Sequence, residues 1–212
     1  MNKEVEKIDW LYYENEAKNR GYNVICGVDE AGRGPLAGPV CAAAVILKDG
    51  QVIEGVNDSK KLSEKKREQL FDKIINEALD YSIAYADEKE IDKLNILNAT
   101  YLAMKRAVEG LSLDADFALI DGNRMPPLDI DGDTVIKGDA KSASIAAASI
   151  LAKVSRDRYM LELAEKYPQY QFEKHKGYGT KLHYEMLDKF GASDIHRQTF
   201  LRTWYEKNDK RS

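Results

Sequence analysis

The chain has 212 residues, a formal net charge of -4 and 43% hydrophobic residues. This length suits one domain with a sizeable core, and the acidic balance argues against a protein that coats nucleic acid with its whole surface. The N-terminus is polar and no apolar run is long enough to cross a bilayer, so we expect a cytoplasmic, monomeric protein without a signal peptide or membrane anchor. The two cysteines, Cys26 and Cys41, lie in apolar runs and are expected to be buried, reduced thiols.

Hydrophobic periodicity predicts helices and strands along the first half of the chain. Residues 4–20 are expected to form an amphipathic helix with Val5, Ile8, Leu11 and Tyr12 on its apolar face. Two buried strands, 24–29 and 39–47, are expected to pair antiparallel across a glycine-rich turn. The elements predicted next are a helix from the capping residue Ser63 to about Leu79, a strand at 81–86 and a helix at 88–109 that stops at Gly110.

The second half repeats the pattern of an apolar strand that ends in an aspartate. Strands are predicted at 117–122 and 134–139, followed by a long helix at 142–166 and short helices from about residue 168. Strands first and then alternating helices and strands indicate an α/β fold with a mixed sheet. We divide the chain into an N-terminal helical segment, 1–21, and a single domain, 22–212.

The run from Gly27 to Pro39 combines two adjacent carboxylates, four glycines and two prolines with Arg33. Asp29 and Glu30 follow a buried strand, where two like charges that lose solvation need an offsetting partner such as a hard divalent cation. Adjacent residues of a regular strand point to opposite faces, so the pair can share a site only if the strand ends or bulges there. An acidic turn is the plainer interpretation of the dipeptide alone, but the whole run favours metal-assisted chemistry on a phosphate backbone.

Asp121 and Asp139 also stand at predicted strand ends. If the three strands that end in these acids run parallel and adjacent, their carboxylates converge, because ligands of such sheets bind beyond the carboxyl ends of the strands. Each aspartate alone is also typical of an ordinary junction between a strand and a loop. Two divalent ions held by four such carboxylates can clamp a phosphodiester for hydrolysis.

These motifs make the sequence similar to bacterial ribonuclease HII, the type 2 ribonuclease H family, from about Tyr22 to Tyr205. The matching motifs are Gly27–Pro39, Asn57–Lys60, Leu119–Gly122, Lys137–Asp139, Ala147–Lys153 and His175–Tyr178. The resemblance implies a ribonuclease H-like fold: a mixed five-stranded sheet flanked by helices, with a helical C-terminal extension. It implies Asp29, Glu30, Asp121 and Asp139 as catalytic metal ligands and Mn²⁺ or Mg²⁺ as cofactor.

The resemblance also implies an endonuclease that acts on RNA–DNA hybrids and on duplex DNA containing single ribonucleotides, cuts 5′ of the ribonucleotide and leaves 5′-phosphate and 3′-hydroxyl ends. Gly32, Arg33 and Gly34 are expected to read the ribose 2′-OH, and Tyr178 the deoxyribose that follows it. Backbone phosphates are expected at Asp58, Ser59 and Lys60, and at the helix start around Lys141 and Ser142.

Three alternatives are weighed against this interpretation. The related ribonuclease HIII family carries an extra N-terminal domain and lacks the tyrosine that matches Tyr178. Another two-metal nuclease of the same fold would cut all-DNA substrates, and a binding module without activity would not need four acids near phosphate. His175, His183 and His196 are not spaced as a ligand set, so we expect surface or structural roles for them.

Overall fold

The computed structural model of the chain describes residues 8–56, 59 and 62–209. A five-stranded sheet forms its centre, in the order β3-β2-β1-β4-β5. The strands are β1 (Ile25–Ala31), β2 (Val40–Ile46), β3 (Asp80–Ala86), β4 (Phe117–Asp121) and β5 (Asp131–Val135). β2 is antiparallel to both β1 and β3, whereas β1, β4 and β5 run parallel and adjacent. The mixed sheet and the antiparallel first pair are confirmed.

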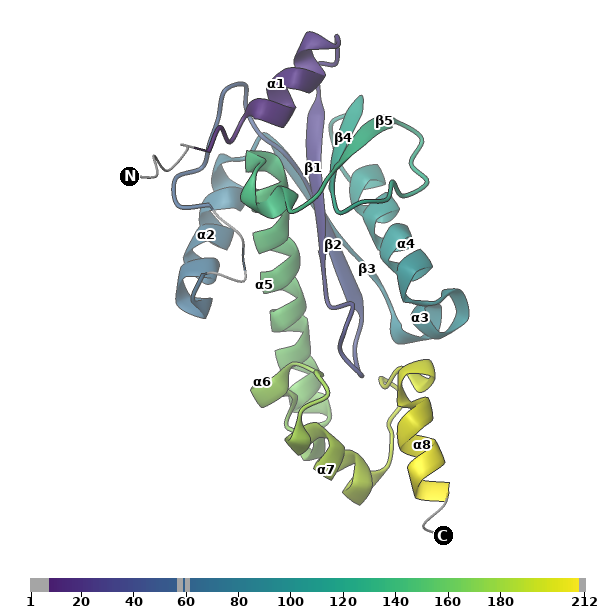
Figure 1. Ribbon diagram of the computed structural model, residues 1–212. Coiled ribbons are helices and arrows are strands. Elements are labelled where there is room, and N and C mark those ends of the chain that lie inside the picture. Colours follow the sequence, from purple (N-terminus) through teal and green to yellow (C-terminus); the bar gives the residue numbers. More distant parts are fainter. Residues whose placement is uncertain (1–7, 57–58, 60–61, 210–212) are drawn as a thin grey trace, which may run out of the picture.

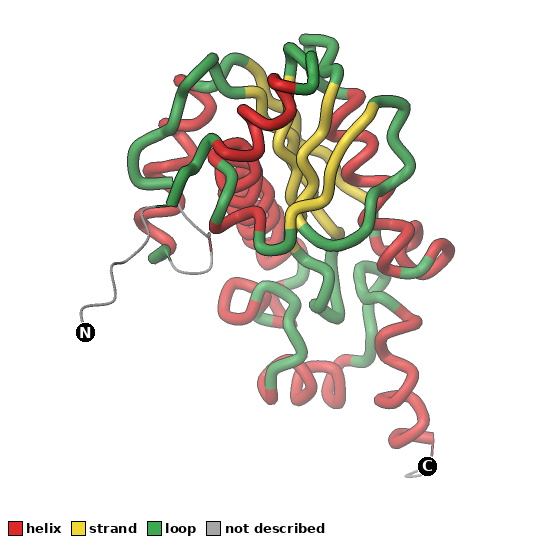
Figure 2. The backbone as a smooth tube through the Cα atoms, turned by 45° about the horizontal axis from the view of Figure 1, so that its top comes forward, coloured by secondary structure: helices red, strands yellow, loops and turns green. Residues whose placement is uncertain are grey.

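Helices cover both faces of this sheet (Figures 1 and 2). The long helix α5 (Ala143–Lys166) and helix α2 (Glu64–Glu77) pack on one face, and α4 (Ile96–Glu109) packs on the other. Ser63 caps α2 as predicted, accepting the Lys66 N–H at 3.3 Å. Alternate residues of β2 enter the two core layers, Cys41, Ala43 and Val45 on the α5 side and Val40, Ala42, Ala44 and Ile46 on the α4 side.

The first half of α5 lies directly against β1 because both elements carry small residues there. All residues from Ala143 to Ala152 are buried. A side chain at Gly27 of β1 would overlap the α5 backbone at Ser144 and Ile145, so glycine is needed for this close approach. The tight packing fixes α5 relative to the end of β1, where Asp29 and Glu30 lie.

Two helix predictions need correction. The first helix, α1 (Tyr12–Asn19), begins later than predicted; residues 1–7 lie outside the described ranges, and Ile8 and Tyr12 are 53% and 52% exposed. Its buried residues are Glu14 and Ala17, because the helix docks through a carboxylate instead of an apolar stripe. The predicted helix 88–109 is divided into α3 (Glu88–Leu94) and α4 at Asn95, whose φ of 68° breaks the helix and whose side chain caps α4.

The predicted strand 134–139 is also placed differently. β5 ends at Val135, and Asp139 lies in a short 3-10 turn, η2 (Gly138–Ala140). Lys137 has a left-handed backbone with φ of 57°, which turns the chain out of the strand before Gly138. Asp139 therefore reaches the site from a turn and not from the end of a strand.

The C-terminal part forms a separate small core beyond the end of the sheet (Figure 1). It contains η3 (Pro168–Tyr170), α6 (Phe172–His175), α7 (Lys181–Phe190), η4 (Gln198–Leu201) and α8 (Arg202–Asp209). Met160 and Leu163 of α5 and Leu36 and Ala37 of the loop after β1 share this core. None of the helices in the described ranges combines the length and the apolar composition that crossing a bilayer requires.

Candidate active site

Asp29 and Glu30 lie where β1 extends beyond its parallel neighbour. Pairing of β1 with β4 ends at Val28 and Ile120, whereas pairing with β2 continues regularly through Ala31. The strand therefore neither ends nor bulges at the two acids. We had expected that one of these irregularities would be needed for adjacent residues to share a site. Both side chains line one cleft because β4 stops at Asp121 and leaves this edge of β1 open.

The Asp29 carboxylate is in an electrostatically unfavourable position. Its side chain is 5% exposed, and burial, followed by the negative charges of Glu30 and Asp121, raises its pKa well above the usual value. The Glu30 backbone N–H donates to Asp29 Oδ1 at 2.7 Å and offsets only part of this cost. A carboxylate held in this way is a group that a bound cation stabilises.

Asp121 and Asp139 are connected through the backbone of the turn η2. The Gly138 N–H donates to Asp121 Oδ1 at 2.6 Å, and Asp139 follows directly with 6% exposure. The fold thus brings Asp29, Glu30 and Asp121 together and joins Asp139 to them through Gly138. Within residues 8–56, 59 and 62–209, no three His, Cys, Asp or Glu side chains are gathered closely enough to form a complete metal-binding group.

The donors around this edge nevertheless fit a hard divalent cation. All of the predicted ligands are carboxylates, which Mg²⁺ and Mn²⁺ prefer. The nearby charge on Arg33, whose Nη1 donates to Glu30 Oε1 at 3.3 Å, comes from a half-exposed side chain and neutralises only one of the acids. Burial beside Glu30 and Asp121 raises the pKa of Asp29, and a bound cation would offset that repulsion.

A cleft of about 230 Å³ runs from the acids to the glycine-rich turn. It brings together residues predicted from distant parts of the sequence and adds two from α5 that had no predicted role in the site, Ser149 and Lys153. Tyr178 stands at the rim with 43% exposure, next to Gly34. The predicted residues that line this cleft are Asp29, Glu30, Gly32, Arg33, Gly34, Ser59 and Tyr178.

A second cleft, of about 320 Å³, lies on the other side of Glu30 and Arg33. It reaches Asp121 and the loop after β4, including Asn123 and Arg124. The two clefts meet at Glu30 and Arg33, so an extended ligand can lie across both.

The residues predicted to contact phosphates differ in their exposure and position. The Ser59 hydroxyl is buried and lies 2.8 Å from that of Ser149, whereas Asp58 and Lys60 lie outside the described residues. Lys141 is exposed. Ser142 is wholly buried, and its hydroxyl donates to Glu14 Oε1 at 2.7 Å, so it holds the start of α5 and does not face the surface.

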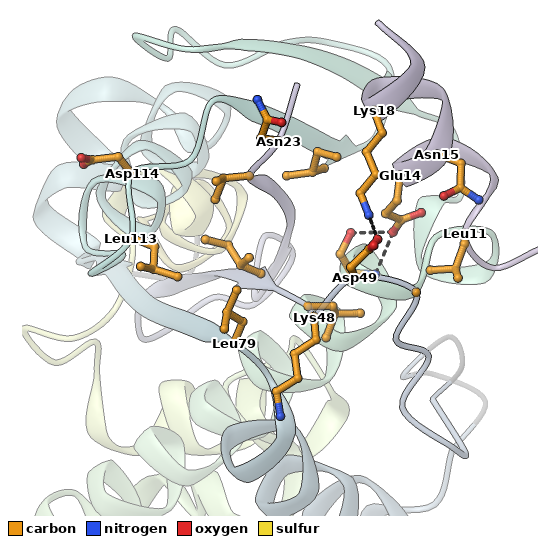
Figure 3. Close-up of a pocket in the computed structure, with 16 residues that line it drawn as sticks. Leu11, Glu14, Asn15, Lys18, Asn23, Lys48, Asp49, Leu79, Leu113 and Asp114 are labelled. Atoms are coloured by element: carbon orange, nitrogen blue, oxygen red, sulfur yellow. Dashed lines mark hydrogen bonds and ion pairs between the residues drawn. The ribbon is translucent and has the colours of Figure 1, made fainter. Parts of the chain in front are cut away.

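Glu14 was not identified from the sequence, and it occupies the helix N-terminus that had been expected to bind phosphate. Its Oε1 accepts the Ser144 N–H at 3.0 Å and the Ser144 hydroxyl at 2.7 Å in addition to Ser142. Glu14 borders a cavity of about 290 Å³ at the opposite end of β1 from the acids (Figure 3). Lys18 of α1 pairs with Asp49 at this cavity, and none of the residues predicted for catalysis lines it.

The three histidines have structural roles. Of the two roles expected from the sequence, surface or structural, the second is the one observed. His183 Nε2 lies 3.0 Å from His196 Nε2, and the His175 and His183 rings stack with centroids 4.4 Å apart. Burial is the largest cause that lowers the pKa of both His183 and His196 to about 4. Neutral, mutually bonded imidazoles of this kind build the C-terminal core.

Known proteins with similar sequences and folds were compared with this geometry. The family described as ribonuclease HII matches residues 26–206. Ribonuclease HII of Caldicellulosiruptor bescii is 60% identical over 196 residues, which cover 92% of this chain and 95% of the relative. That of Clostridioides difficile is 54% identical over 95% of this chain and 80% of the relative.

Solved structures agree with the fold. The ribonuclease H2 of Pyrococcus horikoshii superimposes with a TM-score of 0.73 and 30% identity over 89% of this chain and 100% of its own. A ribonuclease HIII determined in complex with Mn²⁺ has a TM-score of 0.72 at 18% identity, covering 92% of this chain and 73% of its own, and shares the fold.

Proposed function

The chain belongs to the ribonuclease HII family, and we propose that it incises duplex DNA on the 5′ side of a single embedded ribonucleotide, in addition to its ribonuclease H activity on RNA–DNA hybrids. As a ribonuclease H it is an endonuclease that leaves 5′-phosphate ends. The observation that supports the proposal is that Asp29 and Glu30 line one cleft with the glycine-rich turn and Tyr178, and that Asp121 lies near enough for its charge to raise the pKa of Asp29. We propose that it acts as a monomer in cytoplasmic ribonucleotide repair.

The four carboxylates Asp29, Glu30, Asp121 and Asp139 are the proposed ligands of divalent ions. Members of this enzyme family depend on divalent metals, and we propose Mn²⁺ or Mg²⁺ here. Two bound ions supply a water nucleophile of lowered pKa and stabilise charge on the leaving oxygen. The chain contributes a fixed set of anionic oxygens, since β1, β4 and η2 are tied together by regular pairing and by the bond from Gly138 to Asp121.

Selection of the ribonucleotide is assigned to the turn Gly32-Arg33-Gly34 and to Tyr178. A turn without bulky side chains at Gly32 and Gly34 lets its backbone approach a ribose 2′-OH, which donates and accepts hydrogen bonds. The half-exposed Tyr178 ring beside Gly34 is placed to stack on the next sugar. Ser59, the exposed Lys141 and Asp58 and Lys60 remain proposed contacts to the phosphate backbone.

Cleavage of a DNA duplex with one ribonucleotide tests the proposal directly. The enzyme is expected to cut this duplex once with Mn²⁺ or Mg²⁺, to leave the matching all-DNA duplex intact, and to lose activity with EDTA. Cleavage of the all-DNA duplex would indicate a general nuclease of the same fold. Tight binding of a hybrid without cleavage at any metal concentration would indicate a binding module.

The variant Asp121→Asn tests the role of the carboxylates. It is expected to abolish cleavage while it preserves folding and substrate binding, because an anionic ligand is lost with little change in shape. Asp129→Asn is the matched control, since Asp129 is exposed and pairs only with Lys105 among the described residues. Near wild-type turnover of Asp121→Asn at low Mg²⁺ would contradict the assignment.

A further inference from the structure

The guanidinium of Arg197 is buried against the backbone of the glycine-rich turn. Arg197 has no measurable exposure, although it stands far along the sequence in the C-terminal part. Its Nη2 donates to Gly32 O at 2.6 Å, its Nη1 to Arg33 O at 2.9 Å and its Nε to Gly38 O at 2.9 Å. One planar group therefore joins both ends of the loop between β1 and β2.

A second buried arginine holds the same loop from α5. Arg156 is 1% exposed, and it donates to Pro39 O at 3.0 Å, Ala37 O at 3.3 Å and Lys176 O at 3.1 Å. A side chain at Gly32 would overlap Arg156, so the turn is packed on this arginine as well as bonded to the other. The contact with Lys176 also connects the loop to the segment that carries Tyr178.

The burial of these two charges has an energetic cost that packing alone does not explain. Neither guanidinium forms an ion pair with a carboxylate within the described residues. Burial, and then the Arg156 charge, lower the pKa of Arg197 to about 9. An apolar side chain of similar size fills such a space more cheaply, so what arginine uniquely supplies is a rigid fork of donors for several carbonyls.

The Arg197 guanidinium orients the turn because it holds the carbonyls of Gly32 and Arg33 toward the protein interior. Among the described residues, no hydrogen bond uses the backbone N–H of Arg33 or Gly34. The carbonyls of Gly32 and Arg33 are bound to Arg197, and Gly32, Arg33 and Gly34 line the cleft that also contains Tyr178. The orientation of this cleft wall depends on a residue that lines neither cleft.

We propose that Arg197 is a positioning residue that sets the turn Gly32-Arg33-Gly34 against the substrate, and that Arg156 supports it from α5. The C-terminal helical part thereby determines the rate of cleavage at the ribonucleotide, without touching the substrate through Arg197. The inference rests on the proposed function, in which this turn contacts the ribose.

The test compares the cleavage rates of Arg197→Ala and Arg197→Lys with that of the wild type. Rates are expressed per folded molecule. They are measured at a temperature at which circular dichroism shows each protein to be folded. The kcat of Arg197→Ala on the one-ribonucleotide duplex is expected to fall about a hundredfold with KM little changed, because a small misplacement of reacting groups has this effect. Arg197→Lys is expected to fall similarly, since one ammonium cannot bond the three carbonyls at once.

Chemical rescue distinguishes positioning from general stability. Guanidinium chloride at millimolar concentration, far below denaturing levels, is expected to raise the kcat of Arg197→Ala at least about tenfold by refilling the fork, whereas equal concentrations of methylammonium or sodium chloride do not. Arg158→Ala is the matched control, because Arg158 is an exposed arginine of α5 paired with Glu68. Guanidinium is expected to leave the rate of this control unchanged.

A wild-type kcat in folded Arg197→Lys, or an Arg197→Ala rate that guanidinium fails to raise, would overturn the inference. If Arg197→Ala does not fold, Arg197→Lys decides alone. The proposed function has a separate readout, because its failure appears in the wild type as cleavage of a continuous hybrid without cleavage of the one-ribonucleotide duplex. The Arg197 comparison is then decided by kcat on the hybrid.

Discussion

Two buried carboxylates at opposite ends of β1 show how partners, and not burial, distinguish a structural group from a functional one. Glu14 and Asp29 have nearly equal exposure, 7% and 5%. One Glu14 oxygen accepts three hydrogen bonds from Ser142 and Ser144 at the start of α5. Asp29 faces the charges of Glu30 and Asp121 and has a raised pKa.

The difference explains why the start of α5 and the segment from Ser149 to Lys153 contribute differently to the molecule. At its start, Glu14 accepts the Ser144 N–H and two serine hydroxyls, and Ser142 accepts the Ile145 N–H, so this end is closed. Further along, Ser149 and Lys153 line a cleft with acids that carry excess negative charge. The repulsion between Asp29 and its acidic neighbours is the feature on which we base the proposed cation site at this edge.

The largest expected effect is the loss of cleavage activity when the Asp29 carboxylate is neutralised. Asp29→Asn is expected to reduce cleavage of an RNA–DNA hybrid about a thousandfold, because a metal ligand is worth several kcal/mol in the transition state. Its thermal stability is expected to stay equal or rise, since removal of the charge relieves repulsion from Glu30 and Asp121. Steady-state kinetics and a melting curve provide both values, and a loss of stability with intact turnover would reverse the assignment.

Glu14→Ala is expected to show the opposite pattern. Loss of its hydrogen bonds leaves buried donors unpaired and should destabilise the protein by about 3 kcal/mol in urea unfolding. The cleavage rate per folded molecule should be retained at a permissive temperature. Glu16→Ala on the exposed side of α1 controls for the change in charge, and equal destabilisation by both variants would show that the bonds of Glu14 contribute nothing.

The buried histidines His183 and His196 differ from both carboxylates because burial keeps their imidazole rings neutral. The pKa of His183 and of His196 is lowered to about 4 in the fold, so the unfolded chain binds more protons between about pH 4 and 6.5. Stability from these residues is therefore complete above about pH 6.5 and decreases as the pH falls. We expect a loss of roughly 2 kcal/mol per histidine between pH 7.5 and 5, measured by urea unfolding. A pH-independent difference between wild type and His196→Gln would contradict this.

The smallest effect concerns discrimination at the rim of the cleft. Tyr178→Ala is expected to lower kcat/KM on the one-ribonucleotide duplex about ten- to a hundredfold more than on a continuous hybrid, as stacking contributes roughly 1–3 kcal/mol. A hybrid offers many phosphates flanked by ribose, so alignment on a following deoxyribose matters less there. Tyr178→Phe keeps the ring and serves as control. Parallel losses on both substrates would make Tyr178 a general binding or packing residue.

Local patterns in the sequence were sufficient to place β1 and β4 with acids at their ends, whereas the parallel, adjacent arrangement of β1, β4 and β5 was only a condition for the convergence of the acids. Both strands are apolar runs that lead directly into an acid. The break at Asn95 and the turn before Asp139 were missed because both depend on single residues with positive φ. The sequence did not identify Arg197, since no local pattern distinguishes a buried arginine from an exposed one when its partners are backbone carbonyls of a distant loop.

Direct measurement of Mn²⁺ binding tests whether the carboxylates at the end of β1, of which Asp29 is buried beside two like charges, hold the divalent cation. Isothermal titration calorimetry without nucleic acid measures the Mn²⁺ affinity of the wild type, Asp29→Asn and Glu14→Gln. The two buried carboxylates are thus compared under the same conditions. We expect Mn²⁺ to bind the wild type and Glu14→Gln alike and to bind Asp29→Asn far more weakly. Unchanged Mn²⁺ affinity in Asp29→Asn, or an equal loss in Glu14→Gln, would contradict it.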